Sequence, residues 1–249
     1  MNAPEPKLVP QEFIDTFHLN PDGTNPELHE DLKAFLTDEG NGTQNLRHPL
    51  VFSVWHHEAL NGQMNYVYEK KMAAVKKAVR DKEWHSFVWL HERPYRVDAF
   101  MQIAPRLTHK KYWELLSEIW TDTENMWQNY ADWAFCLTAD RPKREKWFMD
   151  DEERAVLAGL PDEIVIYRGA TEEHPYGLSW TLSYEKAEWF AQRLNWMGAV
   201  PVVLRAKIAK DKVIAYMDGR SEQEIIVLPG DVEEGVQFDF IETDGDGGT

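Results

Sequence analysis

The sequence predicts an α+β protein with a helical N-terminal half, and three observations support this fold class. Apolar residues recur at helical spacing from about residue 44 to residue 157. Short β-branched runs replace that spacing after Pro161. One helical segment lies between the first two runs, unlike the regular strand and helix alternation of a doubly wound sheet.

The composition is typical of a globular protein. The chain has 249 residues, of which 43% are hydrophobic and 12% aromatic, enough for one large core or two modest ones. A formal net charge of −16 favours a soluble protein and disfavours a broad electrostatic grip on nucleic acid. The single cysteine, Cys136, excludes an intrachain disulfide, and its apolar neighbours indicate a buried thiol on a helix.

Residues 1–43 are predicted to form an irregular arm, because Pro, Asn, Gly and acidic residues are frequent there. One short helix is expected around residues 26–36. The first residues form neither a basic n-region nor an apolar h-region, and no apolar run is long enough to span a bilayer. We therefore expect a cytoplasmic protein with no membrane partner.

Residues 44–158 are predicted to form a helical region, with clear apolar stripes over residues 64–79 and 112–120. Helix starts are expected where a side chain can cap an N-terminus: Thr108, Thr121 or Asp122, and Asp150 or Asp151. Breaks between helices are expected at four prolines: Pro94, Pro105, Pro142 and Pro161. The tryptophans of this region fall mostly at helical spacing and are expected in its core.

Residues 159–241 are predicted to form the strand-rich core of the fold. The expected strands are the runs 164–167, 200–206, 213–216, 225–229 and 236–241. A helix is expected from Ser183 to about Leu194, with Ala187 and Ala191 on its apolar stripe. The Gly- and Asp-rich residues 242–249 are expected to be a disordered acidic tail.

Three short motifs in the last third of the chain suggest a function. They are Tyr167-Arg168-Gly169 at the end of the first strand, Ser179-Trp180-Thr181 before the helix, and Glu222-Gln223-Glu224 opening a later strand. A guanidinium at a strand end suits phosphate or ribose oxygens, and the following glycine lets a ligand approach the backbone. An arginine paired with a nearby carboxylate is the more ordinary explanation of that residue alone.

The other two motifs also have a functional and an ordinary explanation. Thr181 and Ser183 can simply cap the following helix, which still leaves Ser179 free to face a ligand. In an extended segment Glu222 and Glu224 point to the same face, where two anions are unfavourable unless a cation or a positive transition state meets them. A solvated polar edge leading into a strand is the alternative.

In this order the three motifs resemble the Arg-Ser-Glu class of mono-ADP-ribosyltransferases, which includes bacterial toxins and phage enzymes. The resemblance covers residues 161 to about 239. It implies a split pair of antiparallel sheets with an NAD-binding cleft between them. NAD is then the expected cosubstrate, and ADP-ribose is transferred to a macromolecular acceptor, with protein favoured over nucleic acid and arginine slightly favoured as the modified residue.

The resemblance also implies a role for each residue of the site. Arg168 would hold a phosphate or the nicotinamide ribose, and the backbone of Gly169 would recognise the nicotinamide amide. Ser179 would orient Glu224 and touch ribose, while Thr181 supports the same strand.

Three further residues are expected near the cosubstrate. Trp180 occupies the middle of its triplet, where the family often has a smaller residue. Phe190 matches an aromatic that packs near the nicotinamide, with an ordinary core residue as the alternative. Arg193 precedes the loop 195–198, which matches a phosphate-contacting loop, although a helix C-terminal arginine also stabilises the helix dipole.

Glu224 is the residue expected to matter most for catalysis. Breaking the nicotinamide–ribose bond develops positive charge on the ribose, as in glycoside hydrolysis. A carboxylate bonded to the ribose 2′-hydroxyl stabilises that charge more than it stabilises the ground state. Glu222 would accept or align the acceptor's proton, and the preceding turn, with Tyr216 and Arg220, would touch the target.

Other functions remain open on the sequence. Arg80 and His85 fit the Arg-x4-His pattern of HEPN-type helical ribonucleases, with a solvated helix end as the alternative. A pure binding module on the same scaffold would bind no NAD. Several histidines suggest a metal site as an alternative, but the sequence contains no His-Glu-x-x-His pattern, so no metal is expected. Basic residues 70–80, 110–111 and 141–146 are expected to be solvated, or to meet an acidic partner or RNA.

Overall fold

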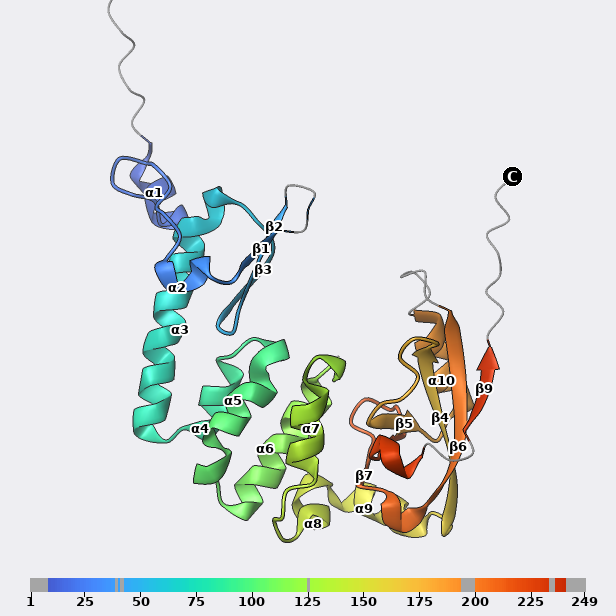
Figure 1. Ribbon diagram of the computed structural model, residues 1–249. Coiled ribbons are helices and arrows are strands. Elements are labelled where there is room, and N and C mark those ends of the chain that lie inside the picture. Colours follow the sequence, from blue (N-terminus) through green and yellow to red (C-terminus); the bar gives the residue numbers. More distant parts are fainter. Residues whose placement is uncertain are drawn as a thin grey trace, which may run out of the picture. The chain divides into compact units, whose positions relative to one another are not determined.

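The computed structural model describes residues 9–38, 40, 43–124, 126–193, 200–232 and 236–240. The chain divides into two compact units, Met1–Ala99 and Phe100–Thr249. Helices and antiparallel sheets occur together, which confirms the α+β class (Figure 1). The division lies within the predicted helical region, whereas the sequence changes character near residues 43 and 158.

The first unit combines a small antiparallel sheet with a long helix, α3 (Asn61–Asp81). The sheet has the order β1 (Leu36–Asp38), β2 (Gln44–His48), β3 (Val51–His56). One buried hydrophobic cluster of this unit consists of Leu28, Leu32, Leu46, Leu50, Val51 and Tyr68. The shorter helices are α1 (Gln11–Phe17), α2 (Glu30–Lys33), η1 (Glu58–Leu60), α4 (Trp84–Trp89) and η2 (Arg93–Tyr95).

This small sheet corrects two predictions. Residues 44–56 form strands instead of the start of the helical region, and the helix expected around residues 26–36 is the short α2, followed by β1. The run 51–55, in which four of five residues are β-branched or aromatic, follows Pro49 and Leu50 and is the local strand signal. Helical spacing averaged over a region of more than about a hundred residues hides strands of this length.

In the second unit, helices precede the sheet. They are α5 (Arg96–Ile103), which spans the division, η3 (Ala104–Arg106), α6 (His109–Asp122), η4 (Trp127–Asn129), α7 (Tyr130–Leu137), α8 (Arg144–Phe148) and α9 (Asp151–Gly159). The predicted start of α6 at Thr108 is confirmed, since Thr108 Oγ1 accepts from the Lys111 N–H. Asp150 begins α9 through a reciprocal capping box with Glu153.

The predicted helix start at Thr121 or Asp122 is wrong, because both residues belong to the last turn of α6. The Thr121 hydroxyl donates to the carbonyl oxygen of Ser117, so it bonds back into its own helix and does not cap a new one. A threonine or aspartate near a helix end therefore does not by itself distinguish a start from a stop.

Tryptophans fill the helical core of the second unit, as the sequence predicts. Trp113, Trp120 and Trp133 are fully buried, and the rings of Trp120 and Trp133 meet edge to face at 5.1 Å. Cys136 is also buried on α7, and burial raises the pKa of its thiol to about 11. Trp127 differs, with 47% of its surface exposed.

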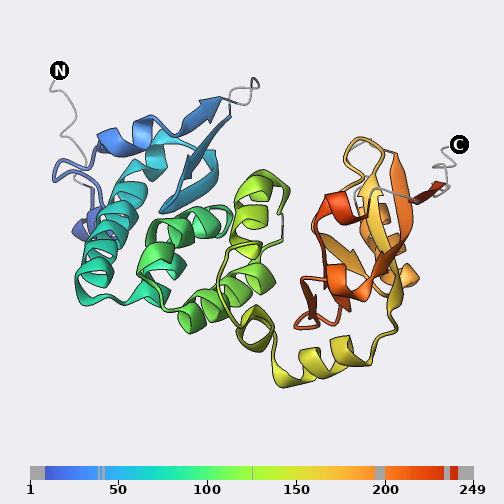
Figure 2. The same cartoon turned by 60° about the horizontal axis from the view of Figure 1, so that its bottom comes forward.

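A six-stranded antiparallel sheet follows the helices (Figure 2, gold to red). Its order is β7 (Ala215–Met217), β8 (Glu224–Ile226), β5 (Ser179–Thr181), β4 (Glu163–Thr171), β6 (Pro201–Ala209), β9 (Gln237–Phe240). The five predicted strands are confirmed with shifted ends, and the predicted helix is α10 (Tyr184–Arg193), packed on β4 and β6. Single 3-10 turns, η6 (Lys210–Lys212) and η7 (Pro229–Asp231), lie between strands.

The sheet is nearly split between β4 and β5. Strands β4 and β6 pair along their whole length, but β4 and β5 pair at a single position, Tyr167 with Thr181. Arg168 and Gly169 therefore lie inside β4, which continues to Thr171, and not at its end as the sequence suggests. Beyond Tyr167 the two strands separate, with Arg168 on one side and Ser179 on the other.

Some predictions fall on residues outside the described ranges. These are the helix end at Leu194, the loop 195–198, Ile241 at the end of the last strand, and the tail 242–249.

Candidate active site

Glu224 is a buried carboxylate that accepts hydrogen bonds from two side chains. It is the first residue of β8 and is 4% exposed. Its Oε1 accepts from the hydroxyl of Ser179 on the neighbouring strand β5, and its Oε2 accepts from Nε1 of Trp120 at 3.0 Å. Helix α6 and two strands of the sheet therefore meet at this one carboxylate.

The protonation of Glu224 is set by opposing effects. Burial raises the pKa of its carboxyl, since it disfavours the charged form. The hydrogen bonds from Ser179 and Trp120, and the charge of Arg220, lower the pKa, whereas Glu222 raises it further. The two donors thus favour the ionised form against the effect of burial.

Arg168 bridges the gap where β4 and β5 separate. Its Nη1 donates to the carbonyl oxygen of Ser179 at 2.6 Å, and its Nε donates to the carbonyl oxygen of Pro175 at 3.0 Å. A Cβ on Gly177 would lie 2.5 Å from Nη2, so a larger residue there would displace the guanidinium from this position. The arginine is fixed by the backbone of the loop that leads into β5.

Arg168 remains charged at neutral pH although it is deeply placed. Burial lowers its pKa to about 10, while the carboxylate of Glu224 and the hydroxyl of Tyr130 raise it. The Glu224 carboxylate therefore favours the charged form of the Arg168 guanidinium, although the two groups form no ion pair within contact distance among the described residues.

Strand β5 places its three side chains in different roles. Trp180 is 2% exposed, and its Nε1 donates to the carbonyl oxygen of Gly177 at 3.1 Å, so its indole belongs to the core. Thr181 Oγ1 donates to the carbonyl oxygen of Glu222 at 2.7 Å and accepts from the N–H of Ser183. Thr181 therefore ties the turn before Glu224 to the start of α10.

The turn before Glu224 differs from the extended segment that the sequence predicts. Ser221 and Gln223 have φ angles of 55° and 48°, in the left-handed region, so Glu222 and Glu224 do not belong to one extended strand that would place both on the same face. The carboxylate of Glu222 pairs with Arg220 at 3.0 Å. Arg220 also donates to the carbonyl oxygen of Thr123 at 3.0 Å, which attaches the turn to the end of α6.

Gly169 is required for the packing of α10. A Cβ there would lie 1.9 Å from the carbonyl oxygen of Ala187 and 2.8 Å from the Cβ of Phe190. Phe190 is half-buried, and Arg193 is exposed with its guanidinium 5.5 Å from the ring centre of Trp189. The nicotinamide contacts expected of these residues stay predictions.

The sequence did not indicate how the helices contribute to the site. Trp120 lies on the predicted apolar stripe of α6, but its position alone does not reveal that its N–H reaches Glu224. The available signal is general, because a buried indole N–H needs an acceptor. Exposed Trp127 similarly contacts the ring of His174, in the loop between β4 and β5, at 5.0 Å.

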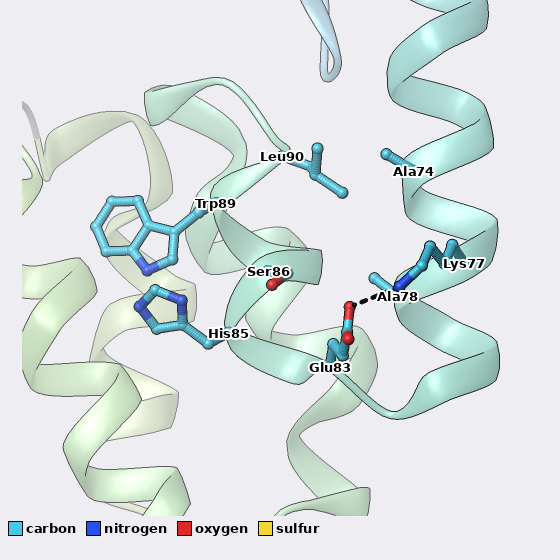
Figure 3. A pocket seen from close by; sticks show the side chains of 8 residues that line it. All are labelled: Ala74, Lys77, Ala78, Glu83, His85, Ser86, Trp89 and Leu90. Carbon is cyan, nitrogen blue, oxygen red and sulfur yellow. Dashed lines mark ion pairs between the residues drawn. The ribbon is translucent and has the colours of Figure 1, made fainter.

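Two cavities lie away from these residues. One, of about 370 Å³, lies in the first unit between α3 and α4 (Figure 3). The other, of about 510 Å³, lies beside α8 in the second unit. Neither is lined by Arg168, Ser179 or Glu224. The buried carboxylate with its two hydrogen-bond donors marks the candidate active site.

The cavity of the first unit contains one residue of the ribonuclease pattern. His85 lines it, with its ring 5.6 Å from that of Trp89 (Figure 3). Arg80 is not among the lining residues, and its guanidinium pairs with Asp81 at 2.9 Å. The pattern therefore does not supply both residues to this cavity.

Within the described ranges, no group of three or more His, Cys, Asp or Glu residues is arranged to hold a metal ion. None of the helices described combines the length and hydropathy that a membrane span needs. Comparisons with protein-family models, with curated proteins and with solved structures each found no match.

Proposed function

We propose that the second unit is an NAD-dependent mono-ADP-ribosyltransferase, which cleaves the nicotinamide–ribose bond and transfers ADP-ribose to a macromolecule. The observation that carries this proposal is the hydrogen bond from Ser179 to Glu224. It joins two of the three sequence motifs at one buried carboxylate. The third motif residue, Arg168, lies on the adjoining strand and interacts electrostatically with the same carboxylate.

The sheet supports the same proposal. Its halves β4-β6-β9 and β7-β8-β5 are joined by a single paired position, which agrees with the split antiparallel fold that the resemblance implies. Arg168 and Ser179 lie where the halves separate. This is the place at which a dinucleotide would enter between the two halves.

The chain's donors fit the cosubstrate. Arg168 is charged at neutral pH, and N–H groups remain on its guanidinium after its two carbonyl contacts, so it can bind a phosphate or a ribose hydroxyl. The carboxylate of Glu224 can accept more hydrogen bonds than the two it has here, which leaves acceptor capacity for a ribose 2′-hydroxyl.

Glu224 would act through its negative charge. Positive charge develops on the ribose as the glycosidic bond breaks, and a carboxylate in a water-poor site stabilises that charge more strongly than one in water. Ser179 and Trp120 hold the carboxylate in place and favour its ionised form. Both are positioning residues for Glu224.

Glu222 would meet the acceptor. Its carboxylate pairs with the guanidinium of Arg220 in this structure, and the arginine side chain of an acceptor protein could replace Arg220 in that pair. This exchange keeps arginine as the favoured modified residue and protein as the favoured acceptor class.

The test is transfer of label from NAD carrying a radioactive ADP-ribose group to a cell extract, with protein and nucleic acid separated afterwards. We expect wild type to label the protein fraction, Glu224→Gln to reduce labelling by about 100-fold or more, and Glu222→Gln to reduce transfer while NAD cleavage continues. Absence of label in both fractions, together with intact NAD, would refute the proposal for the wild-type chain.

A further inference from the structure

The second unit has a basic cavity that the proposed transferase site does not use. It is lined by Trp113, Ala139, Arg141, Lys143, Arg144, Glu145 and Lys146. Four cations and one acid face this cavity in a chain with 43 acidic and 27 basic residues. A local excess of cations in so acidic a chain needs an explanation, because neighbouring acids usually neutralise them.

These four cations lack that neutralisation. In the part of the chain that the structure describes, no carboxylate lies within ion-pair distance of Arg141, Lys143, Arg144 or Lys146. Lysines elsewhere do pair with acids: Lys71 with Glu92, Lys207 with Glu163, and Lys212 with Asp231. Glu145 also lines the cavity and favours the charged form of Arg144, but it forms no ion pair there, so the cavity presents a net positive charge.

Arg144 has a further unmet requirement. It is half-buried, and its Nη1 donates to the carbonyl oxygen of Leu137 at 3.0 Å. Its Nε is buried and has no hydrogen-bond partner. A buried N–H without an acceptor is unfavourable, and desolvation lowers the pKa of this guanidinium. An anion in the cavity would supply both the acceptor and the countercharge.

The backbone around the cavity is held in place. The guanidinium of Arg141 donates to the carbonyl oxygens of Leu107 and Ala104 and lies 4.1 Å from the ring centre of Tyr112. Trp113 Nε1 donates to the carbonyl oxygen of Pro142 at 3.3 Å. The loop that leads into α8 is thus fixed before any ligand binds, which favours affinity.

Lys143 is presented by an uncommon backbone conformation. Its φ of 62° lies in the left-handed region, which few residues other than glycine adopt. Its Nζ lies 5.4 Å from the ring centre of half-buried Trp147. The loop therefore places a cation beside an aromatic surface at the start of α8.

We propose that this cavity is a phosphate-binding site that takes the backbone of a nucleic acid strand. Successive phosphates match several unpaired cations better than one free phosphate does, and a guanidinium fork fits phosphate oxygens. Trp147 offers an aromatic surface next to Lys143, as in sites where bases or sugars pack beside cations. An acidic peptide also carries negative charge, but it has no base that could pack on Trp147.

The cavity and the candidate active site share helix α6. Trp113 lines the cavity, and Trp120, about two turns or 10 Å further along the helix, donates to Glu224. A strand bound here need not be the acceptor, since it can also bring the enzyme to a protein that binds nucleic acid. The proposal does not depend on transferase activity, and its test contains no NAD.

The test measures binding of a short fluorescently labelled single strand by fluorescence anisotropy, once with RNA and once with DNA. Wild type is compared with the double variant Lys143→Asn, Lys146→Gln. Asparagine suits the left-handed conformation at position 143, and both lysines are exposed, so folding is not at risk. We expect Kd to rise about tenfold and the slope of log Kd against log salt to fall by about 1 to 1.5.

The matched control is Lys70→Gln combined with Lys76→Gln, which removes the same charge from exposed positions of α3 and should leave Kd unchanged. Arg144→Lys keeps the charge but removes the buried Nε, and is expected to weaken binding about threefold to tenfold. Glu224→Gln should bind as wild type does, so failure of the transferase proposal would not affect this result.

Three results would overturn the nucleic acid site. One is no binding of either strand by wild type at low salt. Another is an equal loss of affinity in the Lys70 and Lys76 control. The third is tighter binding of a polyglutamate peptide than of both strands, which would assign the cavity to an acidic protein segment.

Discussion

The two charged sites of the second unit differ in how their polar groups are satisfied. At the candidate active site, the buried carboxylate of Glu224 accepts hydrogen bonds at both oxygens, from Ser179 and Trp120. At the basic cavity, the Nε of Arg144 is buried without a hydrogen-bond partner, and the cations around it form no ion pair with a carboxylate among the described residues.

This difference separates a preorganised group from a site that awaits its ligand. A carboxylate whose donors are already in place needs no reorganisation when positive charge develops beside it, which is the requirement for electrostatic catalysis. Unsatisfied donors and unpaired cations instead gain their partners when an anion binds. The following changes test the first half of that comparison, from the largest expected effect to the smallest.

Ser179→Ala should cause the largest loss among the residues that support Glu224. It removes the donor to Oε1, so nicotinamide release from NAD is expected to fall about tenfold to a hundredfold. Because this hydrogen bond lowers the pKa of Glu224, the acid limb of the pH–rate profile should also move to higher pH.

The control for this change is Ser183→Ala. Ser183 accepts from the N–H of Lys186 at the start of α10 and does not contact Glu224. The substitution should lower the free energy of unfolding by about 1 kcal/mol without shifting the acid limb of the pH–rate profile. Equal activity losses in the two variants would mean that Ser179 acts through stability alone.

Arg168→Lys tests the guanidinium between β4 and β5. Lysine keeps the charge but carries all its donors on one nitrogen and lacks the planar fork that reaches two separate carbonyl oxygens and a phosphate, so KM for NAD should rise about tenfold with a smaller change in kcat. Initial rates of nicotinamide release over a range of NAD concentrations give both constants. A changed kcat with an unchanged KM would contradict this role.

Trp120→Phe keeps a large ring in the core but removes the N–H donor to Oε2. We expect kcat to fall about threefold to tenfold, and the acid limb to move to higher pH because the bond to Trp120 lowers the pKa of Glu224. Trp133→Phe, on the ring that contacts Trp120, is the control and should leave the acid limb unchanged. Faster release by Trp120→Phe would show that the indole covers the carboxylate.

Glu224→Gln should give the smallest effect, on stability. Burial raises the pKa of Glu224 in the folded state, so the folded state holds the proton more tightly and its stability falls as pH rises through that pKa. Glutamine does not ionise, so the variant does not lose this stability. It should be about 1 kcal/mol more stable than wild type at neutral pH. Urea unfolding at several pH values should show the difference shrinking toward acid.

Local signals in the sequence located most of the sheet and three residues of the candidate site. The strands after residue 161 are β-branched runs bounded by Gly, Asp and Pro, which are strong signals over a few residues. The motifs identify Arg168, Ser179 and Glu224 as candidate site residues, and the structure brings them together on the neighbouring strands β4, β5 and β8.

The rest depended on information that is not local. The N–H of Trp120 finds Glu224 through the packing of α6 on the sheet, 104 residues away in sequence. Ser221 and Gln223 adopt left-handed conformations although glycine is the residue that usually indicates them, so the sequence predicts an extended segment instead. The close approach of α10 to Gly169 also depends on the packing of distant residues, and the sequence motif alone does not predict it.

The most direct measurement is nicotinamide release from NAD by the purified chain, for wild type and Glu224→Gln at equal concentration. Glutamine can still accept from Trp120, and Ser179 can turn its hydroxyl to accept from the amide, so the fold and NAD binding should survive. We predict release by wild type and a rate about 100- to 1,000-fold lower for the variant, with the Kd for NAD changed less than about threefold. Equal rates for the two proteins would contradict the assignment of Glu224 as the catalytic carboxylate.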